Sequence, residues 1–162
     1  MTYAVMDSPL GPLTLVSTGA GELAGLYMAE HRHRPPLETF GDRDDSVLPA
    51  VAAQLTEYFD HGRTTFDVPL QLAGTPFQQQ VWTALQDIPY GETTTYGDLA
   101  RELGLVPGAS RAVGLANGKN PISIIVPCHR VVGSTGSLTG YGGGLPRKRY
   151  LLDFEQDVPA LL

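Results

Sequence analysis

The chain has 162 residues, of which 42% are hydrophobic and 17% are charged. This is the composition of an ordinary globular protein, and it excludes a disordered tail. The longest apolar run, residues 122–126, is far too short to span a membrane, and the opening MTYAVMDS lacks the basic and apolar blocks of a signal peptide. We therefore expect a soluble, cytoplasmic protein without a membrane partner.

The net charge of −6 is unevenly distributed along the chain. Residues 1–95 carry a charge of −8, whereas residues 96–150 carry +5. The acidic balance thus belongs to the N-terminal part, and the basic segment is suited to face the phosphates of a nucleic acid. On charge alone, a solvated surface is an equally good interpretation.

The first 73 residues predict a small α+β domain. Short apolar runs between glycine-bearing turns indicate an antiparallel sheet with strands at residues 3–6, 12–17 and 23–28. The stretch 31–45, rich in proline and acids, has no regular period, so we expect a loop there. The apolar spacing that follows predicts a helix capped by Ser46 and ending near Gly62, and then a strand over residues 66–72.

The second predicted domain begins at residue 74. Thr75 followed by Pro76 is the start signal of a helix that we expect to end near Pro89. Two shorter helices follow, the first over residues 96–103 with Thr95 as its cap and the second over residues 111–117 with Ser110 as its cap. Such a pair is a helix-turn-helix candidate, although helical hairpins are common in proteins that bind no DNA.

Cys128 is the only cysteine, which excludes an internal disulfide and any zinc site built from several thiolates. The four histidines have no spacing typical of metal ligands, so we expect no metal. Residues 122–126 predict a buried strand that leads into Pro127-Cys128-His129-Arg130. An adjacent imidazole is the commonest means of activating a thiol, provided that a turn or a water joins the two side chains, but a buried cysteine is often only a packing residue.

The sequence Pro127-Cys128-His129-Arg130-Val131 resembles the active-site motif of the O6-alkylguanine-DNA alkyltransferases, also called methylated-DNA–protein-cysteine methyltransferases. The resemblance extends from Ile88 through Glu155 and, more weakly, to residues 8–13. The spacing is typical of that family, because Arg111 lies seventeen residues before the cysteine, Asn120 eight before it and Tyr141 thirteen after it.

The resemblance implies a ribonuclease-H-like N-terminal domain (residues 1–73) and a mostly helical, winged-helix-like domain with a helix-turn-helix (residues 74–162). It also implies DNA repair by a monomer that acts on duplex DNA containing O6-alkylguanine. The alkyl group would pass irreversibly to Cys128, in a single turnover and without a cofactor.

By the same resemblance, His129 takes the proton of the Cys128 thiol through a water, and Glu155 orients His129. The residues implied to recognise the guanine or to support its pocket are Tyr141, Val131, Gly142 and Asn120. In the family the target nucleotide is flipped out of the duplex. Arg111 would then enter the base stack and Tyr96 would rotate the phosphate. The small residues Ala112, Gly114 and Ala116 would let the second helix of the pair enter the minor groove.

The sequence departs from some family members at Gly142, where those members carry serine, and we hypothesise that the smaller residue admits larger adducts. The zinc ligands of some members have no counterpart here. Three alternatives stay open: a lesion-sensing DNA-binding protein without chemistry, which the presence of Cys128 disfavours; a thiol hydrolase that uses Cys128 and His129; and a helix-turn-helix regulator.

Overall fold

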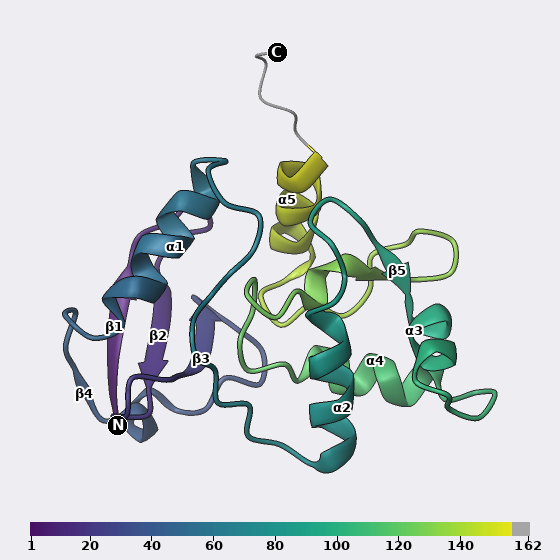
Figure 1. Ribbon diagram of the computed structural model, residues 1–162, viewed down its shortest axis with the longest axis horizontal. Coiled ribbons are helices and arrows are strands. Elements are labelled where there is room, and N and C mark those ends of the chain that lie inside the picture. Colours follow the sequence, from purple (N-terminus) through teal and green to yellow (C-terminus); the bar gives the residue numbers. More distant parts are fainter. Residues whose placement is uncertain (157–162) are drawn as a thin grey trace.

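The computed structural model describes residues 1–156, so residues 157–162 at the end of the predicted second domain lie outside the described part. The protein has an α+β fold, with a small sheet and helix α1 on one side and most of the remaining helices on the other (Figure 1). The helices are α1 (Pro49–Phe59), α2 (Pro76–Leu85), α3 (Tyr96–Glu102), α4 (Ser110–Gly118) and α5 (Leu145–Gln156).

The three predicted N-terminal strands are confirmed as β1 (Thr2–Met6), β2 (Leu13–Ser17) and β3 (Leu23–Met28). The sheet has the order β3-β2-β1-β4, in which β1, β2 and β3 are antiparallel neighbours and β4 (Asp42–Arg43) runs parallel to β1. The predicted loop 31–45 therefore contains one short strand, and it also contains the 3-10 helix η1 (Leu37–Phe40). Both residues of β4 are exposed, so no alternating hydrophobic pattern marked it in the sequence.

Helix α1 forms as expected but starts differently from the prediction. Ser46 is not its cap, because the Ser46 hydroxyl hydrogen-bonds the carboxylate of Asp44 instead. Leu48, in a left-handed conformation with φ of 55°, leads into Pro49 at the first helical turn. The helix buries Val51 and other apolar residues on the face that packs into the core.

Two segments that were predicted as strands are not strands. Residues 66–72 make a single bridge between Leu70 and Leu23, and residues 122–126 make a single bridge between Ile122 and Leu26. Both segments therefore lie along β3 in the space between the sheet and the helices. The second segment is buried as predicted, but its chain turns sharply at Ile124, whose φ is 70°.

The helices of the C-terminal part begin largely where their capping signals predict. Thr75 and Gln78 form a reciprocal capping box at α2, and the Thr95 side chain accepts a hydrogen bond from the Asp98 amide at α3. The predicted Ser110 cap is wrong, because Ser110 is the first residue of α4 and no side chain caps that helix. Helix α5 matches no element that the sequence pattern predicted.

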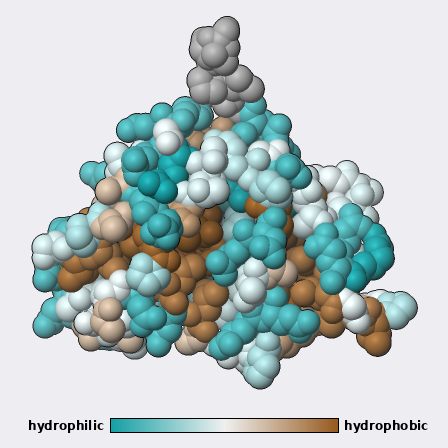
Figure 2. Space-filling view, viewed as in Figure 1, coloured by the Kyte–Doolittle hydropathy of each residue, from teal (hydrophilic) through white to brown (hydrophobic). Residues whose placement is uncertain are grey.

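One continuous hydrophobic core joins the sheet to the helices. It contains β-strand residues such as Leu26, the α1 residue Leu55 and the α2 residue Trp82, whose indole donates to the carbonyl of Ala116 in α4 at 2.8 Å. Hydrophobic surface is visible across the middle of the face shown in Figure 2, between the strands and the helices. Within residues 1–156, no helix is long and apolar enough to cross a membrane.

Candidate active site

The turn that leads to the cysteine is braced by one buried side chain. The Asn120 amide nitrogen donates to the carbonyls of Val126 at 2.7 Å and Ile122 at 3.2 Å, and its oxygen accepts from the Ile122 amide at 3.0 Å. Beyond the bridge to Leu26, backbone groups of this segment therefore pair with the Asn120 side chain, which explains why the β-branched run does not continue along the sheet.

Cys128 begins the 3-10 helix η2 (Cys128–Arg130), and the thiol is buried. Burial raises the pKa of this thiol, while a hydrogen bond from Asn120 and the charge of Lys148 act in the opposite direction. Helix α4 is tied to the same turn, because the Asn117 amide donates to the Cys128 carbonyl at 3.3 Å. The resting site therefore favours the neutral thiol, with cationic and amide groups in place to support a thiolate.

His129 and Glu155 are brought together from positions far apart in the sequence. The His129 Nε2 atom lies 2.8 Å from Glu155 Oε2, and both side chains are buried. Arg130 binds the same carboxylate through Nε at 2.8 Å and Nη2 at 3.0 Å. Burial alone would raise the pKa of Glu155, but the hydrogen bonds from His129 and Arg130 hold it at about 2, so the carboxylate is ionised.

The hydrogen bond to Glu155 fixes the state of the imidazole. A carboxylate accepts hydrogen bonds, so Nε2 carries the proton and Nδ1 is left as the basic nitrogen. Nδ1 is buried and has no hydrogen-bond partner among the residues that the structure describes. Burial lowers the pKa of His129 in spite of the neighbouring carboxylate. The resting imidazole is thus neutral and able to accept a proton at Nδ1.

Lys148 connects α5 to the loop that closes the site. Its ammonium is buried and donates to the carbonyls of Val131 at 2.7 Å and Thr139 at 2.9 Å. Burial lowers its pKa to about 8. Thr139 is also held by Tyr96, because the Thr139 hydroxyl donates to the Tyr96 hydroxyl at 3.0 Å. These contacts hold the segment after Val131 against the start of α3.

The glycine-rich segment packs against the end of the sheet. The Gly142 carbonyl accepts from the Arg32 amide at 2.7 Å, and a Cβ built on Gly142 would lie 2.5 Å from His31 Nε2. A larger residue at position 142 would therefore have to displace the His31 imidazole. A Cβ at position 142 would point at His31, so the hypothesis that the small residue admits larger adducts stays a prediction. Tyr141 beside it is buried, and its hydroxyl makes no well-formed hydrogen bond within residues 1–156, although the Ser123 side chain is near enough to lower its pKa.

Helix α4 presents only part of the predicted contact face. Arg111 and Ala112 are exposed, and Gly114 is half-buried beside the ring of Tyr96. Ala116 is 4% exposed and faces the core, so its predicted place on the bare face is wrong. Leu115, which the sequence interpretation did not single out, is 64% exposed on this helix.

The basic segment contributes less surface charge than its composition implied. Arg130 and Lys148 are buried and bound within the site, and Arg147 is half-buried and donates to the Ala29 carbonyl at 2.6 Å. The exposed cations of this segment are Arg101, Arg111, Lys119 and Arg149. Positive charge available to phosphates is therefore concentrated on and near α3 and α4, with one residue on α5.

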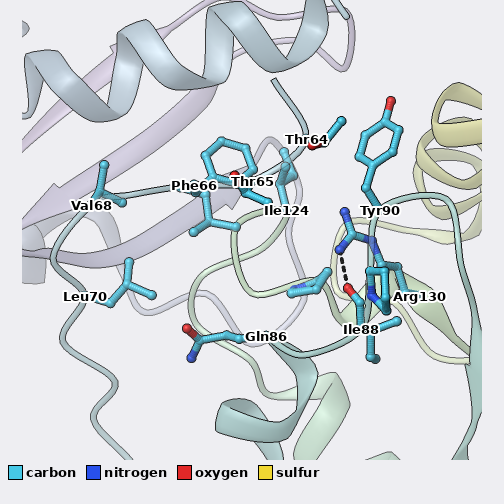
Figure 3. A pocket seen from close by; sticks show the side chains of 13 residues that line it. Thr64, Thr65, Phe66, Val68, Leu70, Gln86, Ile88, Tyr90, Ile124 and Arg130 are labelled. Atoms are coloured by element: carbon cyan, nitrogen blue, oxygen red, sulfur yellow. Dashed lines mark hydrogen bonds between the residues drawn. The ribbon is translucent and has the colours of Figure 1, made fainter. Parts of the chain in front are cut away.

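A separate cavity of about 190 Å³ lies between residues 64–70 and the active-site turn (Figure 3). Phe66, Ile88 and Ile124 are among its apolar walls, and Arg130 enters it while donating to the Ile88 carbonyl at 2.7 Å. Cys128 is not among the lining residues, so this cavity is not the place where the thiol meets a substrate. Within residues 1–156, no three His, Cys, Asp or Glu side chains are grouped so as to hold a metal ion.

The structure thus groups the predicted residues Cys128, His129 and Glu155 around one turn. Sequence reasoning missed Tyr58, Arg130 and Lys148 as parts of this site. Arg130 stands inside the recognised motif, which was an available signal, whereas only the folded chain brings Tyr58 and Lys148 to the site.

Fold and site together define a two-part α+β protein in which a buried cysteine, next to a hydrogen-bonded His–Glu pair, lies beside the packed helices α3 and α4. Two family models match the chain: the ribonuclease-like domain of 6-O-methylguanine DNA methyltransferase over residues 1–72, and its DNA binding domain over residues 76–157. The chain therefore belongs to the O6-alkylguanine-DNA alkyltransferase family, as the motif predicted.

Individual relatives agree with this assignment. A methylated-DNA–protein-cysteine methyltransferase of Mycobacterium bovis is 54% identical over 154 residues, which cover 95% of this chain and 92% of the relative. One of Methanosarcina acetivorans is 47% identical, with 96% and 98% covered. The crystal structure of Mycobacterium tuberculosis OGT in complex with DNA matches with a TM-score of 0.91 and 52% identity, covering 96% of this chain and 93% of that one.

Proposed function

We propose that this protein repairs duplex DNA by moving the alkyl group of an O6-alkylguanine onto its own Cys128. The observation that carries the proposal is the single cysteine beside His129, whose imidazole is hydrogen-bonded to the ionised Glu155, in a chain of the alkyltransferase family. A reaction at an alkyl carbon suits a sulfur nucleophile, and the family relatives bear the corresponding name.

The reaction begins with transfer of the thiol proton to His129 Nδ1, directly or through a water, which creates a thiolate and an imidazolium. Glu155 stabilises the imidazolium through Nε2. The thiolate then attacks the alkyl carbon, so that the S–C bond forms while the C–O6 bond breaks. The displaced guanine takes up a proton and regains its normal form, and the proton balance is that of the original thiol. The thioether that remains is not reversed, so each molecule acts once.

Recognition of the guanine is assigned to the residues around Cys128. Tyr141 is the strongest candidate, because its buried hydroxyl makes no well-formed hydrogen bond within residues 1–156, and its raised pKa, caused mainly by burial, keeps it a hydrogen-bond donor. The backbone of Val131 and Gly142 would face the ring, and Asn120 would keep the turn in shape.

Helix α4 is the proposed minor-groove element, with Arg111 replacing the flipped nucleotide in the base stack. Ala112 and Gly114 allow close approach of the helix, and Tyr96, fixed to Thr139, would direct the phosphate. The adjoining exposed cations supply the salt-dependent attraction to the backbone.

We further propose a domain boundary at residue 73/74, supported by family matches that end at residue 72 and resume at residue 76. A monomer suffices for the chemistry, because the described chain itself supplies the nucleophile, the base and the carboxylate. Action in the cytoplasm is proposed as well, in keeping with the absence of a membrane-spanning helix within residues 1–156.

The test is intact mass after incubation with a duplex that contains O6-methylguanine, with Cys128→Ser as the matched variant. We expect one methyl group per molecule, located on Cys128 by peptide mapping and absent from the variant. An unchanged mass despite tight binding would instead identify a lesion sensor. Repeated turnover of a thioester or amide substrate without stable modification would identify a hydrolase.

A further inference from the structure

The Glu155 carboxylate receives a hydrogen bond from the N-terminal part of the chain. Tyr58, on α1, donates from its hydroxyl to Glu155 Oε2 at 2.7 Å, across a separation of 97 residues. This is the same oxygen atom that lies 2.8 Å from His129 Nε2. The tyrosine is fully buried, so the contact is shielded from water.

The ring of Tyr58 is held in place by other aromatic side chains. It packs against Phe66 at 5.6 Å, Phe154 at 5.3 Å and Tyr90 at 6.0 Å between ring centroids. Burial, followed by the charge of Glu155, raises its pKa far above the ordinary value. The hydroxyl is therefore a permanent donor, and its ring has little freedom to turn away from the carboxylate.

We propose that Tyr58 is a positioning residue that acts on Cys128 through Glu155 and His129: its hydroxyl holds Oε2 and weakens that oxygen as an acceptor for the imidazole. The proposal rests on the function proposed above and gives the N-terminal part a role in the chemistry beyond support of the fold. Hydrogen bonds that share one acceptor compete for its charge. A weaker acceptor stabilises the imidazolium less, which limits how readily His129 takes the thiol proton.

The other groups that face this network are accounted for. Arg130 lies on the same turn as His129 and binds both carboxylate oxygens, while Lys148 adds a positive charge from α5. Both cations oppose protonation of His129, and Glu155 favours it. Tyr90 lies beside Tyr58, and its ring faces the Arg130 guanidinium at 5.7 Å. Oε2 of Glu155 thus receives two neutral donors, the Tyr58 hydroxyl and His129 Nε2, beside the cationic Arg130.

The test is the Tyr58→Phe variant, which keeps the ring and removes the hydroxyl. Because Cys128 is the only cysteine, the rate of its alkylation by iodoacetamide at each pH reports the Cys128 thiolate without any DNA. Freed of a competing donor, Oε2 should stabilise the imidazolium–thiolate pair better. We expect the alkylation profile to move to lower pH by about half to one unit, and the methyl-transfer profile to move with it.

Leu55→Val is the matched control, since Leu55 is fully buried on the same helix and has no group that could hydrogen-bond the carboxylate. It should lower the melting temperature and leave both profiles in place. A Tyr58→Phe profile that stays unchanged, or that moves to higher pH in a folded protein, would overturn the proposal. Thermal melting of each variant establishes that it is folded. If iodoacetamide alkylation shifts as expected while no methyl group is taken from DNA, the role of Tyr58 stands and the proposed function fails.

Discussion

His31 and Gly142 are a complementary pair of residues whose fit depends on the absence of a side chain at position 142. The His31 ring is not free to swing away, because its Nδ1 atom accepts a hydrogen bond from the Met28 amide at 3.0 Å and its edge packs on Tyr27. A side chain at position 142 would therefore meet a fixed ring rather than an empty pocket.

We predict that Gly142→Ser destabilises the fold by about 1–3 kcal/mol and slows methyl transfer, because overpacking must displace His31 or the glycine-rich segment. Adding His31→Ala should recover much of the loss by vacating the space. Thermal unfolding and single-turnover rates of the two single variants and the double variant give the coupling. If the loss of stability in the double variant equals the sum of the losses in the two single variants, the two positions do not interact.

At the scale of elements, α4 has two faces with different duties. Ala112 is exposed, whereas Ala116 is buried and its carbonyl accepts from Trp82.

We predict that Ala112→Leu weakens duplex binding at least severalfold while the melting temperature is unchanged, since the added side-chain volume lies on the proposed groove face. The matched variant Ala116→Leu should cost about 1–3 kcal/mol of stability by overpacking the core. Fluorescence anisotropy and thermal unfolding distinguish them, and normal binding by Ala112→Leu would remove this face from the interface.

The elements also show how far the sequence determined the structure. Short-range signals were sufficient for α2 and α3, because Thr75 and Thr95 directly precede their helices and each side chain accepts from an amide three residues further on. They failed at residues 122–126, because a β-branched run predicts a strand but does not show that its backbone leaves β3 after one bridge and pairs with Asn120 instead. A buried apolar environment was predictable there, but the direction of the chain was not.

The candidate site divides in the same way. Cys128 and His129 are adjacent in a recognisable motif, so their association followed from the sequence. The contact of Tyr58 with Glu155 depends on how α1 and α5 pack across the core, and no local pattern records that packing. The same holds for Lys148, which a sequence count treats as surface charge although its ammonium is buried.

At the scale of the whole molecule, the N-terminal part and the helical part meet at several points around the site. The β3 residue Leu26 donates to the Pro121 carbonyl at 2.9 Å, just before the active-site turn. The chain after β3 is joined to the glycine-rich segment by Arg32 and by Arg147, which spans Ala29 and Gly143. The glycine-rich segment is therefore assembled between the two parts, so its order should depend on their contact.

That contact contains a titratable group, His31. Burial, followed by the charge of Arg147, lowers the pKa of His31 to about 4 from an ordinary value of 6.5. Between pH 6.5 and pH 4, His31 is protonated in the unfolded chain but neutral in the folded protein. The free energy of unfolding therefore falls as the pH falls from 6.5 towards 4. The neutral ring is also required geometrically, because Nδ1 must accept from the Met28 amide.

We predict that His31→Asn, whose side-chain oxygen can replace Nδ1 as the acceptor, reduces this dependence of stability on pH. The difference in slope can reach at most about 1.4 kcal/mol per pH unit, the limit for one proton. Urea unfolding of both proteins at intervals from pH 7 to pH 4 measures it. His129 contributes a slope of the same sign in both proteins, since burial lowers its pKa too, and this contribution cancels in the comparison. Parallel curves for the two proteins would mean that the contact between the two parts tolerates a charged His31, and that the glycine-rich loop is held by Arg32 and Arg147 alone.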